Sequence, residues 1–397
     1  MNVVNKYSFA REAAKRFFSE PLAICGLIGC AIIVVPAIFA PLLANSKPLL
    51  WIENGEITLP FWRYLFAPSA NEVFLEQFFN FIMLALSGWL ICWPLKFIAG
   101  GRTIGGRKIN FWLWLVLLVC ILLGFLFTSP KLDKRDFRAL AAENPGATVI
   151  FSLIPYGPNE QQLGEPWATP SRQHIMGLDE IGRDVASRMI YGGRVSLSVG
   201  IFATVIALLI GCVAGMCAGY FGGVLDLAVM RVVEVMICFP TFLLLLILSS
   251  ILSDMKFTQS ILIVIFVIGF TGWIGICQLV RGEVLKQRNL PYMQNCRVIG
   301  LPVWRTMCFH LLPNVVNPIL IAFSFGVAGA VLAESGLSFL GFGVQAPTAS
   351  WGGLLRQAFS DPLGFWHLTL APGLALFITV VSFNFIGEGI QKVFNVK

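Results

Sequence analysis

The sequence predicts an all-α integral membrane protein, a polytopic helical bundle of about eight transmembrane helices. Two observations predict this class. The chain of 397 residues is 57% hydrophobic and only 12% charged, whereas soluble domains carry about 25% charged residues. Apolar stretches of about 20 residues or more recur along the chain, and each is long enough to cross a hydrocarbon core about 30 Å thick.

The net charge of +7 comes from basic residues in short loops beside the apolar runs. Such a distribution orients membrane helices, because Lys and Arg are retained on the cytoplasmic side. We therefore expect membrane lipid around the chain and no nucleic-acid partner.

Residues 1–20 form a basic segment ahead of an apolar run over residues 21–45. The apolar part of a signal peptide is about 7–15 residues long. Because this run is longer, an uncleaved first transmembrane helix is favoured over a cleaved signal. The N-terminus is then expected in the cytoplasm.

The next three segments alternate between polar and apolar. Residues 46–76 are polar and are predicted to be extracytoplasmic. Residues 77–128 hold two apolar runs around a short loop with basic residues and no acid, which predicts an extra transmembrane hairpin. Residues 129–190 are polar and rich in proline, and are predicted to form a second extracytoplasmic region.

Residues 191–397 are predicted to form the transmembrane core. Eight crossings return the C-terminus to the cytoplasm and place the basic loop 281–313 on the same side. Gly211, Gly215 and Gly219 repeat every fourth residue, a spacing typical of a close helix contact. The predicted core spans lie near residues 195–219, 228–253, 257–280, 314–333 and 366–387.

No motif for catalysis is visible. The three histidines, His174, His310 and His367, lie far apart and lack the spacing of metal ligands. The glycine-rich segment 100–108 resembles a phosphate-binding loop, but Ile109 stands where Ser or Thr would hold magnesium. The sequence predicts no enzyme activity, no metal and no cofactor in this chain.

Ionisable residues inside the spans would indicate a transporter driven by an ion gradient. Glu234 is the one acid well inside an apolar stretch, and Arg231 stands three residues before it. A structural ion pair is the preferred interpretation. A secondary transporter is kept as the alternative function, and the scarcity of intramembrane charge argues against it.

The clearest motif lies between residues 292 and 313. Two short helices, over residues 292–299 and 303–312, are predicted on either side of a break at Gly300, and Pro313 is expected to end the second. Apolar and basic side chains typical of a docking surface follow the same segment: Arg297, Trp304, Arg305, Met307 and Phe309.

This segment resembles the EAA loop of the membrane subunits of ATP-binding-cassette importers, which has Glu-Ala-Ala, then a glycine, and later Leu-Pro. Here Gln294, Asn295 and Cys296 stand at the Glu-Ala-Ala positions, so the acid is missing. The resemblance assigns these residues to coupling with an ATPase: Gln294, Asn295, Cys296, Arg297, Gly300, Pro302, Arg305, Leu312 and Pro313.

Two further stretches resemble the C-type permease of dipeptide and oligopeptide importers. They are residues 177–184 with 191–197, and residues 334–343. Residues 47–50 and 170–173 are similar to the Yej-type branch, which imports oligopeptides and microcin C-like peptides. The family signature residues are Gly182, Arg183, Asp184, Glu334, Ser335, Gly336, Ser338 and Gly341.

The resemblance implies a multi-pass subunit of the bacterial inner membrane with both termini in the cytoplasm. Its implied partners are a B-type permease, two ATPase subunits that bind ATP and magnesium, an extracytoplasmic solute-binding protein and a peptide substrate. Two interpretations stay open for Asp179, Glu180, Arg183 and Arg194: contact with the binding protein or peptide termini, or packing of the external segment.

Overall fold

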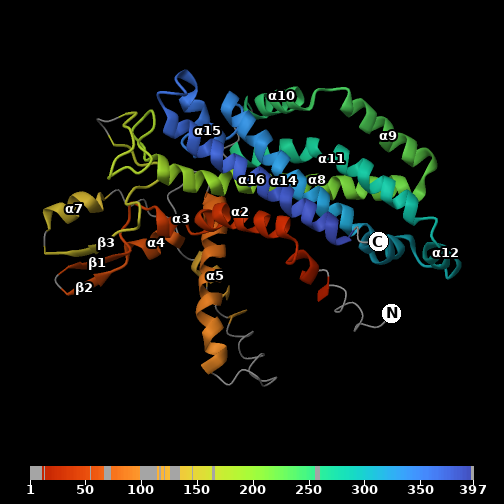
Figure 1. Cartoon of the computed structure of the whole chain (residues 1–397), viewed down its shortest axis with the longest axis horizontal. Helices are drawn as coiled ribbons and strands as arrows, with labels where there is room; N and C mark the ends of the chain where they lie inside the picture. Colours follow the sequence, from red (N-terminus) through yellow and green to blue (C-terminus); the bar gives the residue numbers. More distant parts are fainter. Residues whose placement is uncertain are drawn as a thin grey trace.

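In the computed structural model the chain is described over residues 11–12, 14–53, 55–66, 73–98, 114–115, 118–119, 121–125, 135–144, 146–162, 166–254 and 260–394. Long helices lie roughly side by side along the long axis of the molecule (Figure 1). The predicted helical membrane class is confirmed. These helices are α2 (Pro21–Ile38), α8 (Val185–Phe221), α11 (Ser260–Gln287), α14 (Leu312–Leu340) and α16 (Trp366–Phe394).

Within the described residues, six helices are long and apolar enough to cross a membrane, the sixth being α5 (Val73–Ile98). A bent pair, α9 (Gly223–Ile237) and α10 (Thr241–Asp254), gives a seventh. The predicted run 110–128 lies largely outside the described residues, so the extra hairpin stays a prediction. In Figure 1, α5 points away from the bundle, across its long axis.

The span predicted over residues 228–253 is not one straight helix. α9 and α10 meet at an angle of 87°, with Pro240 directly before the start of α10. Proline lacks an amide hydrogen and restricts the residue before it, so a helix rarely continues through it. The predicted span is therefore one apolar stretch that is broken at Pro240.

The prediction that the second short helix of the loop ends at Pro313 was wrong. The short helix α13 (Val303–Arg305), the π-helical turn η1 (Thr306–Leu311) and α14 follow one another without a gap and form one apolar rod. Pro313 lies just after the π-helical turn, and a local π adjustment of the backbone lets a helix accommodate a proline. The predicted span 314–333 therefore extends in both directions.

The two polar segments predicted to be extracytoplasmic share one antiparallel sheet with strand order β2-β1-β3. Trp51 of the sheet packs edge to face against Phe137, with ring centroids 5.8 Å apart. Strands of three or four residues are too short to show an alternating pattern, so the sheet was not predicted. Its elements, with the short helices nearby, are α3 (Ala40–Leu43), β1 (Leu50–Glu53), β2 (Glu56–Thr58), α4 (Pro60–Phe66), α7 (Phe137–Glu143), β3 (Thr148–Ile150) and α15 (Trp351–Gln357).

The glycine repeat on α8 faces α11. A Cβ atom on Gly211 would lie 2.8 Å from the Cβ of Ile276, and one on Gly215 would lie 2.6 Å from the carbonyl oxygen of Cys277. No larger side chain fits at these positions without a shift. The predicted helix contact is confirmed, and α8 and α11 pack as a closely fitted pair.

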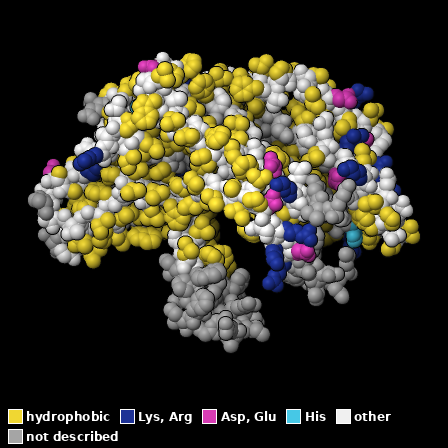
Figure 2. Space-filling view, viewed as in Figure 1, with side chains coloured by type: hydrophobic (Ala, Val, Ile, Leu, Met, Phe, Trp, Pro, Cys, Tyr) yellow, Lys and Arg dark blue, Asp and Glu magenta, His cyan; other side chains and the backbone are white. Residues whose placement is uncertain are grey.

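The start of α2 and the end of α16 lie together, because Lys392 forms an ion pair with Glu20. This end of the bundle also carries α12 (Pro291–Val298), while the sheet lies at the opposite end (Figure 1). Figure 2 shows apolar side chains over the middle of one face, with most of its Lys and Arg toward the end that carries α12.

Candidate functional site

The predicted coupling loop folds as a short helix, a glycine turn and a second short helix. α12 begins at Pro291 and ends at Val298. Gly300 has a φ of +72°, in the left-handed region that side chains disfavour. No atom lies within 4 Å of where its Cβ would be. Gly300 is therefore required by the turn and not by packing.

One side of the loop anchors it to the bundle. Met293 is fully buried and Cys296 is 7% exposed, and Met293 packs in one cluster with Val280 and Val284 of α11. Met307, predicted as a docking residue, packs against the same cluster. Cys296 thus fills a buried position suited to a small side chain, as alanine would.

A hydroxyl group fixes the start of α12. Tyr292 donates a hydrogen bond to Gln287 Oε1 at 2.9 Å. Burial raises the pKa of the Tyr292 hydroxyl, so it stays protonated and able to donate. The contact joins α12 to the end of α11.

The opposite side of the loop is an exposed apolar surface. Val298 is 86% exposed, Ile299 73%, Trp304 63% and Phe309 64%. Trp304 and Phe309 pack edge to face, with centroids 6.0 Å apart. Such a patch at the polar end of a bundle indicates a protein contact. Around it the exposed residues are Gln294, Asn295, Arg297, Pro302, Arg305 and Pro313, and Leu312 is half-buried.

The signature after residue 333 forms a buried polar cluster at the other end. The carboxylate of Glu334 is fully buried and accepts hydrogen bonds from Ser196 at 2.9 Å, Ser338 at 2.7 Å and Ser335 at 3.3 Å. Ser338 in turn accepts from the Val344 amide. The cluster joins α8 to α14 and the chain after it.

Two glycines of the signature also lie at contacts or ends of α14. Gly336 lies beside the ring of Phe242 on α10. Gly341 ends α14 with a φ of +89°. The eight signature residues are buried or half-buried, and their contacts position helices.

The segment over residues 177–184 is also packed inside. Arg183 donates to Asp179 at 2.7 Å, and both side chains are buried. Asp184 caps α8 by accepting from the Ser187 amide. Of the four residues with two open interpretations, Glu180 alone is exposed; the other three are buried, which favours packing.

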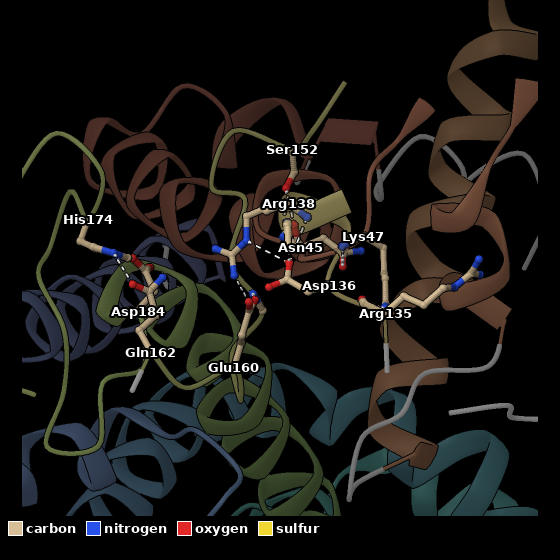
Figure 3. Close-up of polar contacts among 12 residues, drawn as sticks. Asn45, Lys47, Arg135, Asp136, Arg138, Ser152, Glu160, Gln162, His174 and Asp184 are labelled. Atoms are coloured by element: carbon tan, nitrogen blue, oxygen red, sulfur yellow. Dashed lines mark hydrogen bonds and ion pairs between the residues drawn. The ribbon is translucent and has the colours of Figure 1, made fainter. Parts of the chain in front are cut away.

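Figure 3 shows how this segment is fastened to its neighbours. The ring of His174 lies between Asp184, 2.8 Å from its Nδ1, and Gln162, 3.1 Å from its Nε2. Gly182 packs against the backbone of Gln162. These contacts hold the external chain against the start of α8.

Arg194 joins three helices and was not predicted to do so. Its guanidinium is 1% exposed and donates to the carbonyl oxygens of Ala37 at 2.7 Å and Ile38 at 2.9 Å, and to Asn80 Oδ1 at 3.0 Å. The Glu76 carboxylate lies 3.5 Å away. In the sequence, Glu76 directly precedes an apolar run and has no basic residue close to it. This was the signal that could have indicated a buried ion pair with a distant base.

Comparison with known proteins identifies the chain at the level of a family. A family model described as the inner membrane component of binding-protein-dependent transport systems matches residues 194–397. A second, the N-terminal TM domain of oligopeptide transport permease C, matches residues 8–56. Residues 57–193, with α5 and β3, lie between the two matches.

Curated relatives that are similar to this chain are also named as transport permeases. The dipeptide transport system permease protein DppC of Bacillus subtilis is 37% identical over 246 residues, 62% of this chain and 75% of the relative. The oligopeptide transport system permease protein OppC of Haemophilus influenzae is 35% identical over 275 residues, 66% of this chain and 87% of the relative. The glutathione transport system permease protein GsiD of Pectobacterium atrosepticum is 35% identical over 228 residues, 57% of this chain and 74% of the relative. The chain belongs to the family of inner membrane components of binding-protein-dependent transport systems, as a C-type permease of an ATP-binding-cassette importer.

Proposed function

We propose that this chain forms, with a B-type permease, the path by which di- or oligopeptides cross the inner membrane, driven by two separate ATPase subunits and supplied by an extracytoplasmic binding protein. Both termini and the loop over residues 281–313 face the cytoplasm. The observation that carries the proposal is the coupling loop: a patch of exposed apolar side chains on a loop whose other side is anchored in the bundle.

The proposed mechanism follows from this two-sided loop. Val298, Ile299 and Trp304 sit in a cleft of an ATPase subunit, and Met293 transmits the displacement to α11, against which it packs. ATP shifts the permease between two states only if the ATPase contacts differ between them. A turn that holds α12 and α13 at a fixed angle lets the loop move as one body, so a change in those contacts displaces α11.

The coupling role of the loop is tested with the complex reconstituted in proteoliposomes, where peptide uptake and ATP hydrolysis are measured together. Gly300→Val places a β-branched residue at a φ of +72°, a backbone conformation such residues rarely adopt. We expect assembly of the complex and loss of ATP-driven uptake. The control is Gly373→Val in α16, where nothing lies within 4 Å of the added Cβ. Normal uptake in Gly300→Val would refute the coupling role.

The energy source has its own test. ATP depletion should abolish uptake, whereas a protonophore should leave it unchanged in vesicles that hold ATP. The reverse result would support the ion-gradient alternative.

The peptide substrate is tested by competition. The names of the relatives point to dipeptides, oligopeptides and glutathione, and the Yej-type resemblance points to longer peptides. Uptake of a labelled dipeptide and a labelled hexapeptide should be competed by an excess of unlabelled peptide. If no peptide of any length is taken up or competes, the substrate assignment fails while the family assignment stands.

A further inference from the structure

Helix α9 is a rod between two breaks. Before it, Gly222 and Gly223 both have positive φ, +68° and +57°. After it, the chain turns by 87° into α10. Two consecutive residues in the left-handed region are readily accepted only as glycine, so this junction can pivot with little resistance.

Side-chain packing holds α9 along one face only, where Val233 packs in one cluster with Trp273 and Cys277 of α11. Val233 is its single buried side chain, and all of its residues are described. Val224 is 84% exposed and Val235 59%. A helix packed along one narrow face can still shift at its ends unless specific polar contacts hold it there.

One such contact fixes the first turn of α9. Arg281 of α11 contacts Asp226 through both prongs of its guanidinium, Nε to Oδ1 at 2.5 Å and Nη2 to Oδ2 at 2.7 Å. The two side chains are 30% and 19% exposed. A bidentate pair sets direction as well as distance. The pair lies just after Gly222 and Gly223 and restricts the rotation of α9 about them.

Arg281 lies on the part of α11 that meets the coupling loop. Val280 and Val284, on either side of it in sequence, are fully buried and pack with Met293 of α12. A few residues further on, Arg288 donates to the carbonyl oxygen of Gly219 at 3.0 Å, which holds the end of α8 to the same region. A displacement of α12 therefore reaches Arg281 through one packed cluster.

We propose that Asp226 and Arg281 are a positioning pair that carries the movement of the coupling loop to α9. The inference rests on the proposed function. With the pair intact, α9 follows α11 when the ATPases close. Without it, α9 pivots at Gly222 and Gly223 and the bent pair α9–α10 no longer follows the ATP cycle.

A second ion pair on α9 provides a matched control. Arg231 contacts Glu234 at 2.6 Å, but both belong to α9 and are 69% and 58% exposed. Removing Glu234 takes one acid from the same helix and breaks a pair that lies within α9. This pair also agrees with the structural interpretation of Glu234 made from the sequence.

The experiment measures peptide uptake per ATP hydrolysed in the reconstituted complex. Coupling free energies between distant sites correspond to factors of about 5–150, and we expect Asp226→Asn to lower this ratio about tenfold. ATP hydrolysis itself should remain. Glu234→Gln should keep the wild-type ratio. Exchanging the charges, Asp226→Arg with Arg281→Asp, should restore part of the loss, which a general loss of stability would not allow.

A wild-type ratio in Asp226→Asn would overturn the pair's role and leave the proposed function intact. Absence of ATP-driven uptake in the wild-type complex would refute the proposed function instead. Should Asp226→Asn fail to assemble, Arg281→Lys decides the matter, because it keeps the charge and loses the bidentate geometry. A ratio below wild type supports the proposal, and an unchanged ratio overturns it.

Discussion

The two ends of the bundle carry motifs of opposite character. At the end with the sheet, Glu334, Ser338 and Arg183 are at most 3% exposed and their polar atoms are paired inside the chain. At the end with α12, Val298 and Ile299 are more than 70% exposed. Both motifs carry the family resemblance. The first is explained by packing within the chain, whereas the second is an exposed surface that we propose contacts another protein.

Arg194→Ala tests the packed end most severely. The substitution leaves two carbonyl oxygens without their donor and the nearby Glu76 without a counter-charge. Breaking a buried pair by removing one partner costs about 3–5 kcal/mol. We expect a loss of this size in the free energy of unfolding, measured by denaturant titration in detergent micelles.

The control for Arg194 is an arginine that is mostly exposed. Arg231→Ala removes a side chain that is 69% exposed, and its effect should stay within about 0.5 kcal/mol. Equal effects of the two substitutions would show that the buried contacts of Arg194 contribute nothing to stability.

Gly352→Ala tests the joint between α14 and α15. An added Cβ would lie 2.7 Å from the Cα of Ser335, an atom of the backbone that cannot turn away. Overpacking of this kind costs about 1–3 kcal/mol, and thermal unfolding should show it. Gly373→Ala, in open space on α16, should instead be neutral or stabilising by up to about 1 kcal/mol. A neutral Gly352→Ala would mean that the joint is loose.

The difference between the two ends also decided what the sequence could predict. The apolar runs and the glycine spacing on α8 are local signals, and both agree with the described part of the structure. The side of the membrane on which each basic loop lies stays a prediction. The glycine turn at Gly300 was equally visible, because it depends on one residue type at one place. The helix end predicted at Pro313 was wrong, since a proline breaks a helix or starts one depending on the hydrogen bonds around it.

Polar contacts between residues far apart in the chain could not be predicted from the sequence. Asn80 and Ser196 lie far along the chain from Arg194 and Glu334 respectively, and no spacing rule connects such pairs. Residues 177–184 were recognised as a motif, yet whether their charges faced a partner or the interior required their burial. The pairing of Asp226 with Arg281 is of the same kind.

Trp304→Ala tests the exposed end. The indole is 63% exposed and contacts Phe309, so stability should change by no more than about 0.5 kcal/mol. Binding of the ATPase subunits should weaken by about 2 kcal/mol, or roughly 30-fold, if Trp304 is an anchor of the interface. Titration of labelled ATPase onto the permease measures this, and Phe359→Ala, an exposed aromatic at the other end, should leave it unchanged.

Gln294→Glu should have the smallest effect on stability. The first turn of α12 has no acidic residue, and an acid near a helix N-terminus gains about 0.3–1 kcal/mol. The exposed hydrogen bond from Gln294 to the Asn289 carbonyl, 3.3 Å long, is lost in exchange. A net stabilisation of about 0.3 kcal/mol is expected in the same unfolding titration.

The same substitution restores the acid of the EAA motif, so its effect on ATPase binding is the more informative one. A charge at the rim of an interface changes the association rate and its dependence on salt more than the affinity. Gln294→Glu should therefore change the association rate at low ionic strength and lose that effect in high salt. Asn295→Asp places an acid one position along, where the side chain is also exposed. An equal change in both variants would mean that the ATPase senses net charge; a change confined to Gln294→Glu would mean that position 294 faces a specific basic partner.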